Sequence, residues 1–145
     1  MTDPARLRLA LVTNIPAPYR VPVFNRVAAD PRIRLRVFYC HRTEPDRSWD
    51  LGAFDHDHVF LAGRMVTFRG RYIHHNPDAF GQLAAFAPDV VLTNGFNPTH
   101  LYAVAHARWR RIPHVAMTDG TDVSEGKLGF LHRWVRRRVF ARTAA

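Results

Sequence analysis

Short apolar runs alternate with amphipathic stretches along almost the whole chain, and this alternation restricts the possible folds more than any other feature. Five of the runs are predicted as strands: residues 7–13, 33–40, 58–61, 89–93 and 114–118. The fourth is a continuous apolar run, which is typical of a strand buried on both faces. The second instead alternates apolar residues with arginines. That period of two predicts an edge or half-exposed strand.

Amphipathic stretches follow these runs, and their ends carry the residues that favour helix termini. Helices are predicted over residues 19–29, 76–87, 97–111 and 131–139. The second and third begin with Asn-Pro, at residues 76–77 and 97–98. Asparagine favours the cap of a helix and proline favours its first turn, so both pairs predict helix starts.

Strand, loop and helix in regular order predict a parallel sheet with helices on both faces, because right-handed crossovers leave few other topologies. We therefore predict an α/β, Rossmann-like three-layer sandwich with a mostly parallel sheet. Ligands of such folds bind at the carboxyl ends of the strands. The loops at residues 14–19, 94–97 and 119–126 are accordingly expected to surround one crevice.

Length and composition fit a single packed domain. The chain has 145 residues, of which 47% are apolar and 23% charged, close to the average for globular proteins. No apolar run reaches the roughly 18 residues of a membrane span, and residues 1–8 lack the apolar core of a secretory signal. The single cysteine, Cys40, suits a reducing compartment. We expect a cytoplasmic protein.

Positive charge is concentrated at the C-terminal end. The formal net charge is +9, and residues 127–145 hold six basic residues and no acidic one. Five of these lie in or just before the last predicted helix: Lys127, Arg133, Arg136, Arg137 and Arg138. A basic amphipathic helix of this kind can lie against an anionic membrane or against phosphate groups. The same pattern also fits an ordinary solvated helix face.

Several common motifs are missing. No G-x-G-x-x-G follows the first strand, and the glycine-rich segment before Lys127 has neither the spacing nor the hydroxyl of a phosphate-binding loop. Ser48 and Ser124 lie outside any nucleophile elbow. The histidines lack metal-ligand spacing, so no metal is predicted. No acidic cluster of a receiver domain follows the first strand. Nucleic acid is a disfavoured partner, because no known DNA- or RNA-binding motif accompanies the charge.

Polar residues near two predicted elements are candidates for chemistry. Asp119 and Asp122 follow the last strand, where a carboxylate can bind a sugar hydroxyl or act as a base. Both also fit the ordinary role of turn formers. His75 precedes the helix at residue 76. It is a candidate contact for an anionic ligand, with capping and solvent exposure as the alternatives.

Four segments carry a family resemblance: LVTNIPAPYRVPVFN, NPDAFGQLAAFAPDVVLTNG, PHVAMTDGTD and a basic helix that ends RRRVFARTAA. In this order they resemble the N-terminal half of family 4 retaining glycosyltransferases of the GT-B type. The resemblance covers residues 7–144, and its most specific part is residues 15–25. It implies a Rossmann-like N-terminal domain over residues 1–145 that ends before the interdomain linker.

The resemblance also implies an activity. Members of the family transfer a sugar from a nucleotide-sugar donor to a glycan or lipid-linked acceptor, generally without a metal or other cofactor. Their C-terminal domain binds the donor and carries paired glutamates eight positions apart, whereas this chain has only Glu44 and Glu125. We therefore expect one half of a hexosyltransferase, inactive without a C-terminal half in cis or in trans.

The resemblance assigns the acceptor to the crevice at the strand ends. Asp119 is the expected catalytic residue, at a position where many members have a histidine. The expected acceptor-binding residues are Asn14, Pro18, Tyr19, Arg20, His75, Asn94, Gly95, Phe96, Asn97, Gly120, Thr121, Asp122 and Lys127. The arginines of the last helix are expected at the inner face of an anionic membrane. The alternative is an independent module that binds phosphate-bearing ligands, nucleic acid or anionic membrane through that helix.

Overall fold

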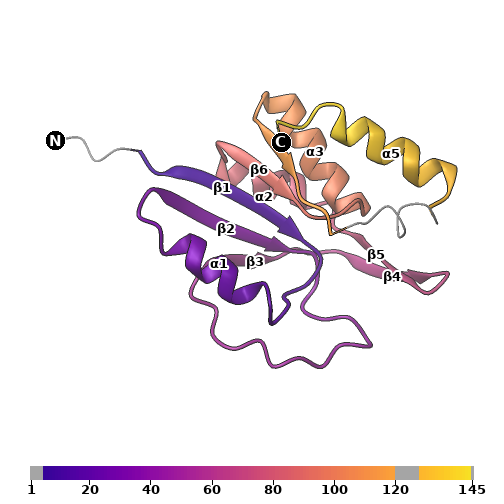
Figure 1. Cartoon of the computed structure of the whole chain (residues 1–145), viewed down its shortest axis with the longest axis horizontal. Coiled ribbons are helices and arrows are strands. Elements are labelled where there is room, and N and C mark those ends of the chain that lie inside the picture. Colours follow the sequence, from indigo (N-terminus) through magenta and orange to yellow (C-terminus); the bar gives the residue numbers. More distant parts are fainter. Residues whose placement is uncertain (1–4, 120–127, 145) are drawn as a thin grey trace.

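A computed structural model of the chain describes residues 5–119 and 128–144. Its strands are β1 (Leu7–Thr13), β2 (Ile33–Tyr39), β3 (Asp57–Phe60), β4 (Arg64–Phe68), β5 (Arg71–His75), β6 (Val90–Thr93) and β7 (His114–Ala116). Its helices are α1 (Val21–Ala28), α2 (Ala79–Phe86), α3 (Pro98–Arg110) and α5 (Phe130–Phe140). Five strands form a parallel sheet in the order β3-β2-β1-β6-β7, and β4 and β5 form a separate hairpin (Figure 1). The predicted Rossmann-like α/β fold is confirmed.

Side chains of β1 alternate between the two faces of the sheet, and helices cover each face. Ala10 and Val12 are fully buried in a cluster that includes Leu83 of α2 and residues of α3. Leu11 belongs to a second cluster with Phe24 of α1. Helix α5 lies beside α3 (Figure 1). The apolar faces are thus covered, and the polar loops gather at the carboxyl ends of the strands.

Strand β2 lies inside the sheet, so of the two predicted alternatives, an edge or a half-exposed strand, the edge position is wrong. It pairs with β1 along seven residues and with β3 on its other side. Its arginines are accommodated because their side chains extend along the end of α2. The Arg36 guanidinium lies 5.0 Å from the centroid of the Phe86 ring and 2.7 Å from the Asp57 carboxylate. The aliphatic parts of the arginine side chains cover apolar surface, while their guanidinium groups contact polar partners.

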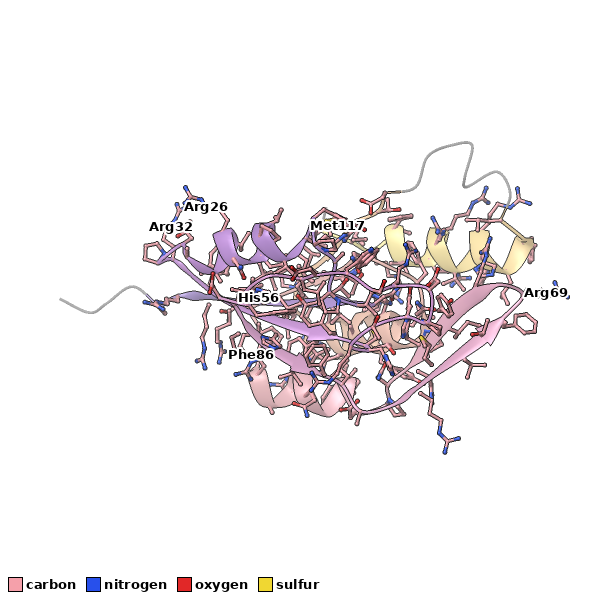
Figure 2. The ribbon with its side chains drawn as sticks, turned by 90° about the horizontal axis from the view of Figure 1, so that it is seen from below. Arg26, Arg32, His56, Arg69, Phe86 and Met117 are labelled. Atoms are coloured by element: carbon pink, nitrogen blue, oxygen red, sulfur yellow. The ribbon has the colours of Figure 1, made fainter. Side chains whose placement is uncertain are left out.

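The β4–β5 hairpin was not predicted. Its antiparallel strands are joined by the two residues Arg69 and Gly70, whose φ angles are 49° and 73°. Two positive φ angles are typical of a type I′ turn. Val66 and Phe68 of β4 are 55% and 58% exposed, and His74 is the one buried residue of β5, so neither strand shows the alternation that a buried face imposes. Figure 2 shows Arg69 at the opposite end of the molecule from Arg32.

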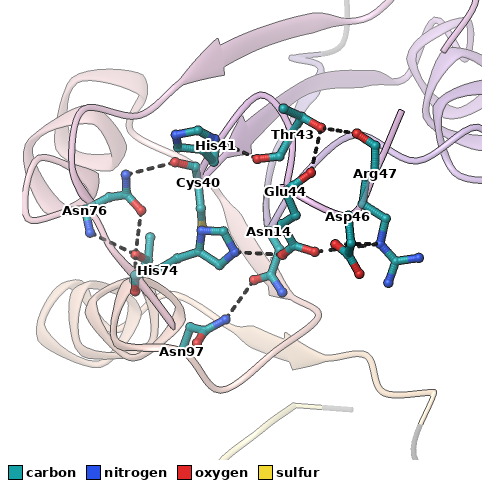
Figure 3. A network of polar contacts seen from close by, with 11 residues as sticks. Asn14, Cys40, His41, Thr43, Glu44, Asp46, Arg47, His74, Asn76 and Asn97 are labelled. Atoms are coloured by element: carbon teal, nitrogen blue, oxygen red, sulfur yellow. Dashed lines mark hydrogen bonds and ion pairs between the residues drawn. The ribbon is translucent and has the colours of Figure 1, made fainter. Parts of the chain in front are cut away.

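Asn76 is a buried structural residue, so its predicted role as the cap of α2 is wrong. The helix begins only at Ala79, and Asn76 is 1% exposed. The Asn76 Nδ2 donates to the carbonyl oxygen of Cys40 at 2.9 Å (Figure 3). It also donates to the carbonyl oxygen of Leu61 at 3.3 Å. Its Oδ1 accepts a 2.8 Å hydrogen bond from Thr99 Oγ1. One buried amide therefore connects the ends of β2 and β3 to α3.

Candidate functional site

The carboxyl ends of β1, β6 and β7 lie side by side, and predicted site residues follow each of them. Asn14 comes directly after β1, Asn94 directly after β6 and Asp119 shortly after β7. Asn97 Nδ2, at the start of α3, donates to Asn14 Oδ1 at 3.0 Å (Figure 3). Arg20, just before α1, forms an ion pair with Asp119. Residues from distant parts of the chain therefore meet at one edge of the sheet.

A hollow of about 240 Å³, here called the loop pocket, opens beside this ion pair. It is lined by Thr13, Asn14, Ile15, Ala17, Tyr19, Arg20, Glu44, Arg47, Trp49, Asn94 and Asp119. The Arg20 side chain is largely buried, whereas the Asp119 carboxylate is 75% exposed. The Tyr19 and Trp49 rings meet edge to face, with centroids 6.4 Å apart. Amides, a carboxylate and aromatic rings around one hollow offer partners for the hydroxyls and the apolar face of a sugar.

Glu44 is a pocket residue that the sequence analysis did not identify. It is 9% exposed, and its Oε1 lies 3.0 Å from Nε2 of the buried His74 (Figure 3). Arg47 Nε lies 3.9 Å from the other carboxylate oxygen. A buried carboxylate needs such partners because it has lost its water. Glu44 and His74 are 30 residues apart and belong to no motif, so only the folded chain reveals this pair.

His100 is fully buried behind Gly95, and both of its ring nitrogens lack a hydrogen-bond partner among the described residues. Burial lowers the pKa of His100 to about 3, with a smaller contribution from the charge of His74. The imidazole is therefore neutral near pH 7. A Cβ added at Gly95 would lie 2.8 Å from His100 Cε1, so this close contact requires glycine at position 95.

A second hollow of about 580 Å³, here called the basic pocket, lies between the β4–β5 hairpin, the loop after β6 and the start of α5. Five residues that were predicted to bind the acceptor line it: Asn14, Asn94, Gly95, Phe96 and Asn97. The hairpin adds Phe68, Arg69, Arg71, Tyr72 and Ile73, and later segments add Thr118, Gly129, His132 and Arg136. Asn14 and Asn94 line both pockets, so the two hollows adjoin.

Arg136 differs from the exposed arginines of α5, because its half-buried side chain lines the basic pocket. Its guanidinium carbon lies 4.4 Å from the centroid of the Phe96 ring. Burial lowers the pKa of Arg136, and the positive charge of Arg71 lowers it further. Arg136 was predicted for a membrane surface, and in the structure it lines the basic pocket.

The outer face of α5 carries exposed apolar and basic side chains together. Phe130 and Leu131 are 80% and 69% exposed, and Arg133 and Arg137 are also exposed. Arg138 lines a groove between α3 and α5. Within the part of the chain that the structure describes, no helix has the length and apolar character needed to cross a membrane.

Some predicted residues lie away from both pockets. Pro18 is exposed, and the exposed His75 packs its ring edge to face on Tyr102, with centroids 5.8 Å apart. The predicted Gly120, Thr121, Asp122 and Lys127 lie outside the described residues. In residues 5–119 and 128–144, no group of three or more His, Cys, Asp or Glu side chains is arranged to hold a metal ion.

Comparison with known proteins adds information on the fold. No protein-family model and no curated protein matches the chain. Among solved structures, the chain is similar to a UDP-N-acetylglucosamine 2-epimerase, with a TM-score of 0.59 and 17% identity over 95% of this chain and 40% of that one. It is also similar to a protein from Listeria monocytogenes assigned as such an epimerase, with a TM-score of 0.54 and 13% identity over 97% of this chain and 38% of that one.

These neighbours are carbohydrate-processing enzymes whose GT-B fold is shared with glycosyltransferases. The chain spans about two fifths of their length, 40% and 38% respectively. At such low identity the likeness concerns the fold alone. The chain therefore has the Rossmann-like fold found in one part of GT-B-type enzymes.

Proposed function

We propose that this chain is the acceptor-binding half of a glycosyltransferase that moves a hexose from a nucleotide sugar to a glycan or lipid-linked acceptor. The observation that carries the proposal is the convergence of Asn14, Arg20, Asn94 and Asp119 around the loop pocket. Amide, guanidinium and carboxylate groups are suited to bind and orient hydroxyls. The likeness to nucleotide-sugar enzymes supports the class of substrate.

Asp119 is the proposed catalytic residue. Its exposed carboxylate would accept a hydrogen bond from the acceptor hydroxyl and direct the hydroxyl oxygen toward the donor sugar. Arg20 is a positioning residue, because its largely buried guanidinium pairs with this carboxylate. Asn14 and Asn94 would bind further hydroxyls. Asn97 supports them by fixing the Asn14 amide through a 3.0 Å hydrogen bond.

The donor is a nucleotide sugar that enters the reaction as a co-substrate. In this proposal a C-terminal half, in the same polypeptide or supplied in trans, holds the nucleotide, and the chain needs no metal or other cofactor. The size of the loop pocket supports a role in binding one of the two substrates, because it is an open hollow of only about 240 Å³. Such a space fits part of a sugar better than a complete nucleotide sugar, since drug-sized ligands usually occupy roughly 300–1,000 Å³.

The proposal includes contact between α5 and an anionic membrane. Exposed Phe130, Leu131 and Trp134 next to exposed arginines support it, because apolar side chains enter the acyl boundary while basic ones bind headgroups. Each basic residue near such a surface contributes about 1 kcal/mol. Arg133→Glu combined with Arg137→Glu should therefore reduce retention on phosphatidylglycerol vesicles by more than tenfold. Unchanged retention in a flotation assay would contradict the proposed contact between α5 and the membrane.

A nucleotide-sugar 2-epimerase is the second candidate, because both solved neighbours are assigned this activity. The two functions differ in their substrates. A glycosyltransferase half binds an acceptor sugar in the loop pocket, whereas an epimerase has the nucleotide sugar as its only sugar substrate and inverts it at C2.

Titration of the ¹⁵N-labelled chain separates the two candidates. We expect acceptor oligosaccharides to shift the amide signals of Asn14, Arg20, Asn94 and Asp119, and Asp119→Asn to weaken these shifts. Asp89→Asn is the matched control, since this partly exposed carboxylate pairs with Arg8. Conversion of UDP-N-acetylglucosamine to its C2 epimer would favour the second candidate. Turnover of any nucleotide sugar by the chain alone, at an ordinary enzymatic rate, would overturn the first.

A further inference from the structure

The basic pocket has an unusual balance of charge. Arg69, Arg71, Arg136 and His132 line it, and among the lining residues that the structure describes none carries a carboxylate. Arg69 and Arg71 form no ion pair with an acidic residue among the described residues, whereas Arg8, Arg20, Arg32, Arg36 and Arg47 each do. Positive charges that lie close together repel one another, and an anion bound beside Arg69 and Arg71 would reduce that repulsion.

The geometry points to a phosphate site: we propose that the basic pocket binds the phosphate or diphosphate group of the acceptor. The inference rests on the proposed function, which it narrows to acceptors that carry phosphate. Arginine is suited to this task because its planar guanidinium donates two parallel hydrogen bonds to phosphate oxygens.

The side chain of one arginine is held in place before any ligand binds, and the backbone of a second is fixed. Arg136 is half-buried on α5 and stacks on the Phe96 ring at 4.4 Å. Arg71 belongs to β5, whose pairing with β4 fixes its backbone. The charge of Arg71 disfavours protonation of Arg136, which indicates that the two cations influence each other across the pocket. A half-buried arginine such as Arg136 loses less conformational entropy on binding than an exposed one.

Uncharged donors border the same space. The pocket lining includes Asn97, which directly precedes α3, and Gly129, which directly precedes α5. Neither helix has an acidic residue in its first turn, and neither start is capped by a side chain. The free N–H groups at such helix starts favour a neighbouring anion. They therefore add to a site that the arginines already define.

The remaining walls indicate what the phosphate is attached to. The volume of about 580 Å³ exceeds the need of a lone phosphate, and Phe68, Ile73 and Phe96 form apolar walls. Asn14 and Asn94 connect the basic pocket to the loop pocket. An acceptor with its phosphate in the basic pocket would thus extend a sugar toward Asp119. Both a soluble sugar phosphate and a lipid-linked sugar diphosphate have this chemistry.

Calorimetric titration of the whole chain with inorganic pyrophosphate tests the site. We expect saturable binding at constant ionic strength, weakened at least about tenfold by Arg71→Gln and by Arg136→Gln. Arg64→Gln is the matched control, because this exposed arginine lies on the same hairpin outside the pocket, and it should change Kd less than about twofold. Arg71 is exposed, so its variant keeps the fold even if the Arg136 variant does not. Circular dichroism checks both.

Absence of pyrophosphate binding, or equal weakening by all three variants, would overturn the inference. Two further probes distinguish the source of the phosphate. Competition by a hexose 1-phosphate supports a soluble acceptor, whereas Arg71-dependent retention on phosphatidylcholine vesicles that contain polyprenyl diphosphate supports a lipid-linked one. If pyrophosphate binds as expected but no sugar shifts the signals of Asn14 and Asp119, the phosphate site is supported and the proposed function fails.

Discussion

The loop pocket and the basic pocket share two asparagines but differ in the balance of their charges. In the loop pocket two basic residues meet two carboxylates, Arg20 with Asp119 and Arg47 with Glu44. In the basic pocket three arginines and a histidine meet no carboxylate among the described lining residues. Paired charges present both donors and acceptors, which suits neutral hydroxyls. Arg69 and Arg71, which form no ion pair among the described residues, suit an anion. One edge of the sheet therefore offers sites for two kinds of ligand.

Loss of the Asp119 carboxylate should have the largest effect. Asp119→Asn removes the group that orients or deprotonates the acceptor hydroxyl, so sugar transfer should fall about 100-fold or more. The measurement is the transfer rate with a C-terminal half supplied in cis or in trans. Pyrophosphate binding should stay unchanged, because Asp119 does not line the basic pocket. Full transfer by this variant would contradict the catalytic role of Asp119.

Lowering the pH tests whether His100, behind the basic pocket, resists protonation in the folded state. Unfolded His100 takes up a proton near pH 6.5, whereas folded His100 does so only near pH 3. The unfolded state therefore binds more protons between these values, and stability is lost as pH falls from 6.5 toward 3, by at most about 1.4 kcal/mol per pH unit for this residue. Urea unfolding at several pH values measures the slope.

His100→Leu should make that slope shallower, because it replaces a buried imidazole without hydrogen-bond partners by an apolar side chain. His75→Leu provides the control, since His75 is exposed. If the unfolding free energy of His100→Leu depends on pH as steeply as that of the original chain, His100 does not cause this pH dependence.

Gly95→Ala should distort the wall of the basic pocket and spare the loop pocket, which Gly95 does not line. The new methyl group would press against the buried His100 ring, and such overpacking costs about 1–3 kcal/mol of unfolding free energy. Gly81→Ala is the matched control, because nothing lies within 4 Å of its added Cβ and alanine favours the helix. Urea denaturation of both variants measures the contrast; equal stability would show that the contact is loose.

Arg20→Gln should have the smallest effect on stability. Its partner Asp119 is 75% exposed, so the ion pair is screened by water and should contribute less than about 1 kcal/mol. Urea denaturation in low and high salt measures this contribution. A loss of about 3 kcal/mol would instead indicate that Arg20 holds a buried network together.

Much of the fold follows from periodicity. The apolar runs predict five strands at nearly the observed positions, because a parallel sheet buries each strand regardless of its partners. The position of β2 inside the sheet was not predictable in this way. Its arginines signal exposure, and only the Phe86 ring and the Asp57 carboxylate explain how they are accommodated.

The residues of the candidate site also differ in whether the sequence could predict them. Asn14, Asn94 and Asp119 were predictable, because they follow strands whose carboxyl ends must meet in a parallel sheet. Arg69 and Arg71 were not, because His74 is the one buried residue of the hairpin strands and their exposed residues follow no regular pattern. Glu44 and His74 meet only through the tertiary fold.

The turn at Arg69 limits how far the stability of the hairpin can be raised by substitution. Its φ of 49° costs an ordinary side chain about 1–2 kcal/mol, whereas glycine or asparagine adopts this conformation more easily. A replacement chosen for hairpin stability alone would therefore take a cation away from the rim of the basic pocket. At this position thermostability and affinity for anions oppose each other, so selection for one would reduce the other.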